Sequence, residues 1–155
     1  MNQYLKKTAA AVLAILSCGL FTACAPSGAA SSAAQASSAG KASKKIGVLQ
    51  YAVNASLDNC YTGFLKGLAE SGYEKGKNLT VEFQNSQADA SNAQMMAKTM
   101  VSKQYDLLAG IAPPAAMALY GAAKSTDIPT VFTAVSDPVG AGLVQSLDKP
   151  GVNCT

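Results

Sequence analysis

The sequence has 155 residues, of which 49% are hydrophobic and only 14% charged, and its formal net charge is +3. Charged residues are too few for a charge-rich disordered chain, and the absence of His excludes a histidine base, a His-metal site or a Ser-His-Asp triad within it. From Ile46 onward seven lysines stand against nine acidic residues, a net charge of −2. This balance removes the usual electrostatic reason to expect a nucleic-acid partner.

Residues 1–23 have the proportions of a bacterial export signal. Two lysines near the start precede an uncharged apolar run over residues 8–21, which is too short to span a bilayer comfortably. The small residues that follow, and then Cys24, resemble the lipobox of a bacterial lipoprotein signal. Cys24 is therefore the predicted site of lipidation.

Two alternatives to lipidation at Cys24 stay open. Cys18 is a second candidate, although it would leave a much shorter apolar run. An ordinary secretory signal, cleaved near Ala23 or Ala25 without a lipid, fits the same small-residue pattern.

Residues 24–45 are dominated by Ala, Ser and Gly and contain no aromatic residue. Such a segment cannot bury enough surface to offset the entropy of ordering it, so we expect a flexible tether. The order of an anchor, a tether and a domain over residues 46–155 indicates how the protein is located. We expect it to be held on the extracytoplasmic face of the cell membrane.

The segment after the tether alternates between strand-like and helix-like patterns. Short apolar or alternating runs predict strands at 46–51, 79–83, 106–111 and 130–135. Between them, a first helix opens near Ser56 and ends at Gly72, a second opens at Asp89 or Ser91, and a third starts with Pro113 and Pro114. The predicted buried faces of these helices are Leu57, Tyr61, Phe64, Leu65 and Leu68; Ala93, Met96, Ala97, Met100 and Val101; and Ala116, Leu119, Tyr120 and Ala123.

This alternation predicts an α/β fold, a Rossmann-like parallel sheet with helices on both faces and strand order 2-1-3-4. In such sheets the ligand lies beyond the carboxyl ends of the strands, at the point where strand order reverses. We therefore expect the loops at 51–57 and 112–115 to flank a ligand, with those at 85–91 and 135–139 nearby.

Several spaced motifs resemble the ABC-transporter substrate-binding proteins often associated with tryptophan or tyrosine uptake. The motifs are Gln50-Tyr51 with Ser56-Leu57-Asp58, Gly63-Phe64 with Gly67-Leu68, and the runs 72–78, 106–108, 112–116 and 131–144. The resemblance implies a type I periplasmic-binding fold with two lobes, of which residues 46–155 would be an incomplete first lobe, ending at the start of a fifth strand. It also implies capture of an amino acid, with aromatic ones among the candidates, for delivery to an ABC permease.

Two positions depart from the pattern that the resemblance implies. Asn54-Ala55 stands where members often carry His-Pro, and Ala112-Pro113-Pro114 stands where they often carry Ala-Thr-Pro. The second change removes a hydroxyl and a backbone N–H near the expected ligand carboxylate.

The predicted ligand-binding residues share the loops and helix starts at the carboxyl edge of the sheet: Tyr51, Asn54, Ser56, Leu57, Pro113, Pro114, Ala115, Thr133, Ala134 and Ser136. With no Arg in the sequence, a ligand carboxylate would be received by a helix N-terminus. Ser56 could equally be only a helix cap, Tyr51 could stack on the ligand or pack on the first helix, and Asn54 could bind ligand or shape a turn.

Other functions have less support. A ligand-sensing lipoprotein fits the same pattern as a transporter component. An α/β enzyme is a weaker alternative, because the sequence contains neither a phosphate-binding Gly-rich loop nor an acid–base pair. No cofactor or metal is expected. Cys60 is interpreted as a small core or boundary residue, and nothing in the spacing supports a disulfide with Cys154.

Overall fold

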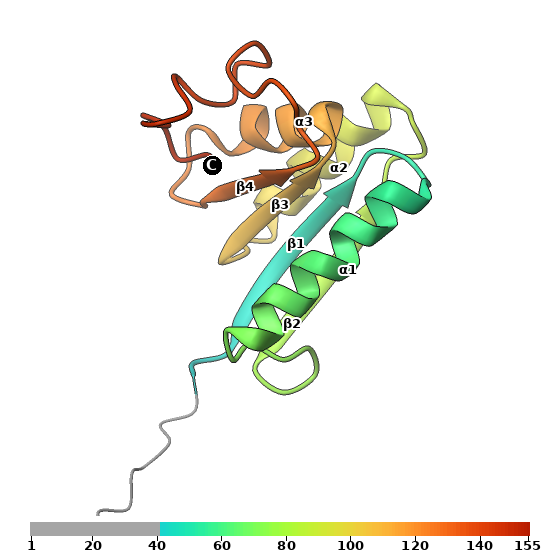
Figure 1. Ribbon diagram of the computed structural model, residues 1–155, viewed down its shortest axis with the longest axis vertical. Helices are drawn as coiled ribbons and strands as arrows, with labels where there is room; N and C mark the ends of the chain where they lie inside the picture. The colour runs from blue at the N-terminus through green and yellow to red at the C-terminus, as the bar shows by residue number, and fades with distance from the viewer. Residues whose placement is uncertain (1–40) are drawn as a thin grey trace, which may run out of the picture. The chain divides into compact units, whose positions relative to one another are not determined.

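The computed structural model describes residues 41–155, which contain a four-stranded parallel sheet with helices on both faces (Figure 1). The elements are β1 (Lys44–Gln50), α1 (Ala55–Glu70), β2 (Leu79–Asn85), α2 (Ala90–Ser102), β3 (Leu107–Ile111), α3 (Pro113–Ala123) and β4 (Thr130–Thr133). The strands lie in the order β2-β1-β3-β4, which confirms the predicted Rossmann-like α/β fold. The predicted signal, most of the tether and Cys24 lie outside the described residues.

Strand β1 starts two residues before the predicted strand start at residue 46, so it includes the last two residues of the predicted tether. Lys44 pairs with Leu79 of β2, and its Nζ lies 2.8 Å from a carboxylate oxygen of Asp106. The backbone N–H of Lys45 donates to the same carboxylate at 2.7 Å. These bonds to Asp106 extend β1 to include Lys44 and Lys45. A search for apolar runs in the sequence cannot predict such an extension, because it depends on charged residues.

Helix α1 covers one face of the sheet. Its half-buried residues pack on Ile46, Val48, Ala109 and Ile111 of the strands. They include all of the predicted face except Leu65: Leu57, Tyr61, Phe64 and Leu68, together with Cys60.

The end of α1 is a Schellman motif, and Gly72 lies just past the helix end, where the sequence predicts it. Gly72 has φ +84°, which a residue with a side chain rarely adopts. Its N–H donates to the carbonyl of Ala69 at 2.9 Å, and the N–H of Tyr73 donates to that of Leu68 at 2.8 Å. The last carbonyls of the helix are thus satisfied where the chain turns towards β2.

Helices α2 and α3 cover the opposite face and pack on Leu49 and Leu108 (Figure 1). Their buried residues follow the predicted helical spacing: Ala93, Ala97 and Met100 of α2, and Ala115, Ala116, Leu119 and Ala123 of α3. Gly110 lets α3 approach β3, because a Cβ built on Gly110 would lie 2.5 Å from the Cα of Ala116.

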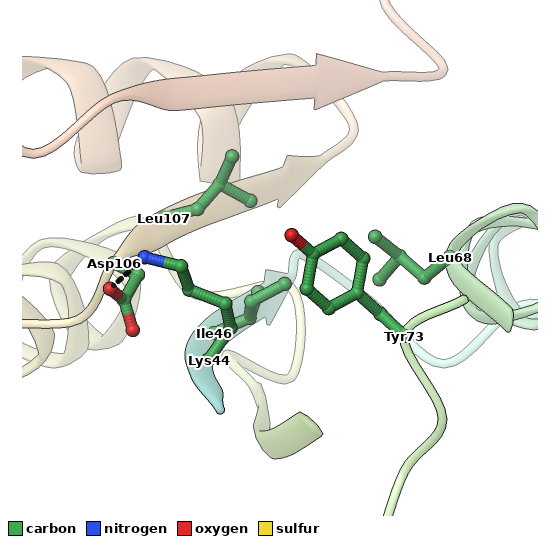
Figure 2. Close-up of a pocket in the computed structure, with 6 residues that line it drawn as sticks. All are labelled: Lys44, Ile46, Leu68, Tyr73, Asp106 and Leu107. Atoms are coloured by element: carbon green, nitrogen blue, oxygen red, sulfur yellow. Dashed lines mark hydrogen bonds and ion pairs between the residues drawn. The ribbon is translucent and has the colours of Figure 1, made fainter. Parts of the chain in front are cut away.

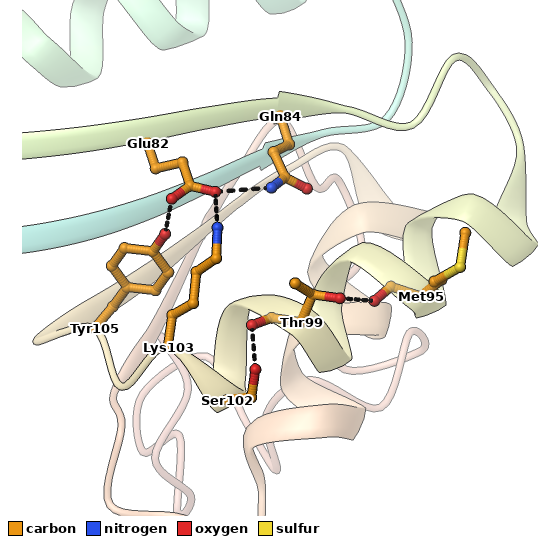
Figure 3. Close-up of polar contacts among 7 residues, drawn as sticks. All are labelled: Glu82, Gln84, Met95, Thr99, Ser102, Lys103 and Tyr105. Carbon is orange, nitrogen blue, oxygen red and sulfur yellow. Dashed lines mark hydrogen bonds and ion pairs between the residues drawn. The ribbon is translucent and has the colours of Figure 1, made fainter.

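A polar cluster joins β2 to the end of α2 (Figure 3). The carboxylate of Glu82 accepts hydrogen bonds from Lys103 at 2.5 Å, from Gln84 at 2.8 Å and from the hydroxyl of Tyr105. The bonds from Lys103 and Tyr105 lower the pKa of Glu82 to about 2. Burial, and then the Glu82 carboxylate, raise the pKa of Tyr105.

The segment after β4 packs back on α3 and β4, where Leu143, Val144 and Cys154 are buried with Ala116. The N–H of Thr130 donates to Asn153 and that of Thr155 to Thr130, so residues 153–155 run parallel to β4. This pairing agrees with the expected start of a fifth strand.

Candidate functional site

The carboxyl ends of β1 and β3 lie side by side where the strand order reverses. Gln50, the last residue of β1, is in register with Ile111, the last residue of β3. The N–H of Tyr51 donates to the carbonyl of Ile111 at 3.2 Å, so the two loops leave the sheet together. This is the position at which open α/β sheets bind ligands.

Tyr51 joins the loop after β1 to the loop after β2. Its carbonyl accepts from the hydroxyl of Ser86 at 2.9 Å and from the N–H of Ala88 at 2.7 Å. Its hydroxyl donates to the carbonyl of Ala88 at 2.8 Å. The half-buried ring packs on the α2 and α3 side of the sheet, so the expected alternative of packing on the first helix is wrong. Stacking on a ligand stays a prediction.

The start of α1 is capped by Asn54 and not by Ser56. Asn54 has an extended backbone, and its side-chain oxygen accepts from the N–H of Ser56 at 2.8 Å. Ser56 itself is exposed inside the first turn, so its predicted capping role is wrong. Within the described residues, the amides of Ala55 and Leu57 make no hydrogen bond and stay available at the edge.

The start of α3 has almost no amide donors. Pro113 and Pro114 occupy its first two positions, and Ala112 provides no side-chain cap. The first bond inside the helix runs from the N–H of Ala116 to Ala112 at 3.0 Å. This leaves the N–H of Ala115 without a partner among residues 41–155.

Two predicted ligand contacts have their side chains in the core. Ala115 is fully buried between α2, α3 and the sheet, and Leu57 packs against the opposite face of the sheet. Each can reach a ligand at the edge through its backbone N–H and not through its side chain.

The three helix starts differ in charge. Asp89 caps α2 by accepting from the N–H of Asn92 at 2.7 Å, so a carboxylate already occupies the positive end of that helix. Helix α1 has Asp58 in its first turn, whereas the first turn of α3 contains no acid. Of these three helices, α3 therefore presents the least neutralised positive end to an anion.

The loop after β4 completes the edge. The N–H of Ala112 donates to the carbonyl of Thr133 at 3.1 Å, which places the start of α3 beside the end of β4. Thr133 is half-buried, and Ala134 and Ser136 are exposed. The predicted strand ends two residues early because Ala134, with φ +57°, turns out of the extended conformation.

Strained backbone gathers at this edge of the sheet. The loop after β2 contains Gln87 and Ala88 at φ +56° and +60°, and Ala112 has φ +77°. Side chains make such angles costly, and they recur where a backbone is shaped for function.

Gln50 is a polar residue of this site that the sequence did not identify as one. It is fully buried, and its Nε2 donates to the carbonyl of Ala52 at 2.8 Å and to the carboxylate of Asp58 at 2.7 Å. Its Oε1 has no hydrogen-bond partner within the described residues. The available signals were an amide at the end of an otherwise apolar strand and the place of Gln50 in the Gln50-Tyr51 motif.

Two hollows lie away from the loops after β1 and β4. One of about 210 Å³ lies at the amino ends of β1 and β3, at the opposite edge of the sheet, beside the Lys44–Asp106 ion pair (Figure 2). Hydrogen bonding within this pair raises the pKa of Lys44 and lowers that of Asp106. Another of about 430 Å³ lies between the starts of α2 and α3, where Pro114 lines it with Met117.

The two cysteines of the described chain are both free. Cys60 is a half-buried residue of α1 that packs on the sheet, as expected of a core or boundary residue. Cys154 is buried beside α3, and burial raises the pKa of its thiol to about 11. None of the helices between residues 41 and 155 is long and apolar enough to cross a membrane.

Comparison with known proteins gives consistent matches over this part of the chain. Residues 45–155 match the family model for ABC transporter substrate binding proteins. The tyrosine-binding protein of Clostridioides difficile (strain R20291) is 47% identical over 113 residues, which are 73% of this chain and 32% of that protein.

Two solved structures are similar in sequence and fold. An ABC domain from Streptococcus pneumonia in complex with L-Trp is 46% identical with a TM-score of 0.70, over 74% of this chain and 38% of that one. The ligand-free, open structure of CD0873 from Clostridium difficile, a substrate binding protein with adhesive properties, is 45% identical with a TM-score of 0.69, over 72% and 37%. The chain thus spans about a third of the length of these relatives.

Proposed function

Because this chain belongs to the ABC transporter substrate-binding proteins, we propose that it binds a small solute outside the cytoplasm and delivers it to an ABC permease. We propose an aromatic amino acid as the ligand. Tyrosine and tryptophan are the ligands named for two relatives that are 47% and 46% identical.

The observation that carries the proposal is the arrangement of the carboxyl edge of the sheet. Two helix starts, α1 and α3, flank the point where strand order reverses, and the N–H of Ala115 has no partner in the described structure. A ligand carboxylate accepting from Ala115 would gain both a hydrogen bond and the positive end of α3. The aromatic side chain of the ligand would then extend towards Tyr51.

Closure around the ligand would need a second surface opposite this edge, as in two-lobed binding proteins. Residues 41–155 would supply one wall of the clamp and the carboxylate-binding amides. We expect this chain to bind its ligand weakly, because it spans only about a third of its relatives' length.

We further propose that Cys24 carries a lipid anchor and that the Ala- and Ser-rich residues after it tether the domain to the membrane. The pattern of small residues before Cys24 supports this. Replacing Cys24 with Ser should abolish incorporation of a labelled fatty acid and release the protein from the membrane fraction. Unchanged labelling, or labelling that Cys18→Ser abolishes instead, would contradict it.

NMR titration of ¹⁵N-labelled chain with L-tryptophan tests the ligand proposal, because chemical shifts detect weak binding residue by residue. We expect shifts at the amides of Tyr51, Ala115 and Ala134. Tryptamine, which lacks the carboxylate, is the matched control and should leave the Ala115 amide unshifted. No shift with any aromatic amino acid, or shifts confined to the opposite edge near Lys44, would refute the proposal.

A further inference from the structure

Gln50 closes the loop that follows β1. Its side-chain Nε2 donates one hydrogen bond to the carbonyl of Ala52, in the middle of the loop, and another to the carboxylate of Asp58, in α1. The N–H of Asp58 in turn donates to the carbonyl of Asn54 at 2.9 Å. One buried amide therefore connects the end of the strand, the loop and the first turn of the helix.

The orientation of this amide is determined by its partners. A carbonyl and a carboxylate only accept hydrogen bonds, so both require the NH₂ group of Gln50. Turning the amide over would place Oε1 against two oxygen atoms. The two donated bonds thus leave Oε1 buried and without a partner among the described residues.

A buried acceptor without a partner is unfavourable for folding. The residues that share this face of the sheet, Val48 and Ile111, are apolar and buried. Ala52 is half-buried and Asp58 is exposed, so water can solvate both acceptors if the amide is removed. Stability alone therefore gives little reason for a glutamine at this position.

We propose that Gln50 is a positioning residue for the ligand-binding edge. Its two hydrogen bonds hold residues 51–54 and the start of α1 in the geometry that receives the ligand, with an unsatisfied acceptor as the structural cost. The role in ligand binding rests on the proposed function; the role in ordering the loop does not.

The variant Gln50→Leu tests this role by removing both donors and the unsatisfied acceptor together. We expect the midpoint of thermal unfolding to change by no more than about 4 °C. Hydrogen exchange at the amides of Asp58 and Ala88 should become at least about tenfold faster, because the loop opens locally. The amide of Ala97, in the core of α2, should keep its rate, and the affinity for L-tryptophan should fall about tenfold, because binding must now order the loop.

Three other variants serve as controls. Gln84→Leu removes a glutamine amide whose one hydrogen bond among residues 41–155 is to Glu82. It should change neither the exchange of Asp58 nor the affinity. Asp58→Asn keeps a side-chain oxygen that accepts from Gln50, so it should stay close to wild type. Asp58→Leu removes only the second of the two hydrogen bonds of Gln50, so it should speed exchange at Asp58 less than Gln50→Leu does. Adding it to Gln50→Leu should change little more, since the bond between the two side chains is already gone.

Each outcome decides the proposal. Faster exchange at Asp58 and Ala88, with an unfolding midpoint within about 4 °C of wild type and weaker binding, supports it. Equal acceleration at Ala97 would show a purely structural role, and unchanged exchange or unchanged affinity would each overturn it. If the wild-type chain does not bind L-tryptophan, the ligand proposal fails, and the exchange rates alone support or overturn the ordering of the loop by Gln50.

Discussion

Replacing Gly110 with Ala should separate α3 from the sheet. The added Cβ would lie 2.5 Å from the Cα of Ala116 and 2.8 Å from its N, whereas ordinary van der Waals contact begins at 3.4 Å. Both obstructing atoms belong to the backbone of a helix, so no side chain can turn away. Helix α3 must move by about 1 Å, and overpacking of this kind costs about 1–3 kcal/mol.

We expect Gly110→Ala to lower the free energy of unfolding by about 2 kcal/mol, since the better backbone entropy of Ala offsets part of the overpacking. Urea unfolding measures the change as a lower midpoint with an unchanged slope. The displaced helix start should also weaken ligand binding, because it carries the amide of Ala115.

The matched control is Gly121→Ala in the same helix. A Cβ at Gly121 meets nothing within 4 Å, and Ala is favoured over Gly inside a helix by about 1 kcal/mol. Gly121→Ala should therefore stabilise the fold, whereas Gly110→Ala should destabilise it. Equal stability of Gly110→Ala and wild type, or equal losses at both positions, would refute the reasoning.

Two further predictions concern a helix cap and an ion pair. Asn54→Ala should lower the free energy of unfolding by about 1 kcal/mol, because a cap is lost, whereas Ser56→Ala should change it little; the reverse order in urea unfolding would restore Ser56 as the cap. Glu82 has its pKa lowered from 4.5 to about 2, so its contribution to stability is present above pH 4.5 and is lost as the pH falls towards 2. Glu82→Gln should therefore flatten the acid limb of a plot of unfolding midpoint against pH, and an unchanged limb would contradict this assignment.

The helices and strands were predictable because the residues on their buried faces are apolar and recur in the sequence at regular spacing. Ala93, Ala97 and Met100 recur at helical spacing in the sequence and are buried together on α2. The parallel sheet was predictable because helices alternate with strands, so that parallel crossovers are required. The strand order then followed from the Rossmann-like fold class.

The details of the candidate site were less predictable, because they depend on contacts between distant residues or on unusual backbone. Asn54 and Ser56 are both good capping residues, and the point where β1 ends decides between them. Nothing in the sequence marks Ala112 or Ala134 for a positive φ, which normally indicates Gly. Gln50 is buried at the end of a strand and bonds to Asp58, eight residues later in a helix.

The Glu82 cluster also bears on self-association of the sheet. Within the described chain β2 is the outermost strand on its side, so one row of its backbone groups faces outward, and such an edge can pair with a second copy. Glu82 is the central residue of Leu79–Asn85, so antiparallel pairing about the strand centre would place two copies of this carboxylate opposite each other. Both carboxylates would be charged at neutral pH, and with the pKa of Glu82 held at about 2 they would stay charged even below pH 4.5. Like charges directly opposite each other disfavour pairing. The interaction that fastens β2 to α2 thus also holds a charged group at the centre of this edge strand.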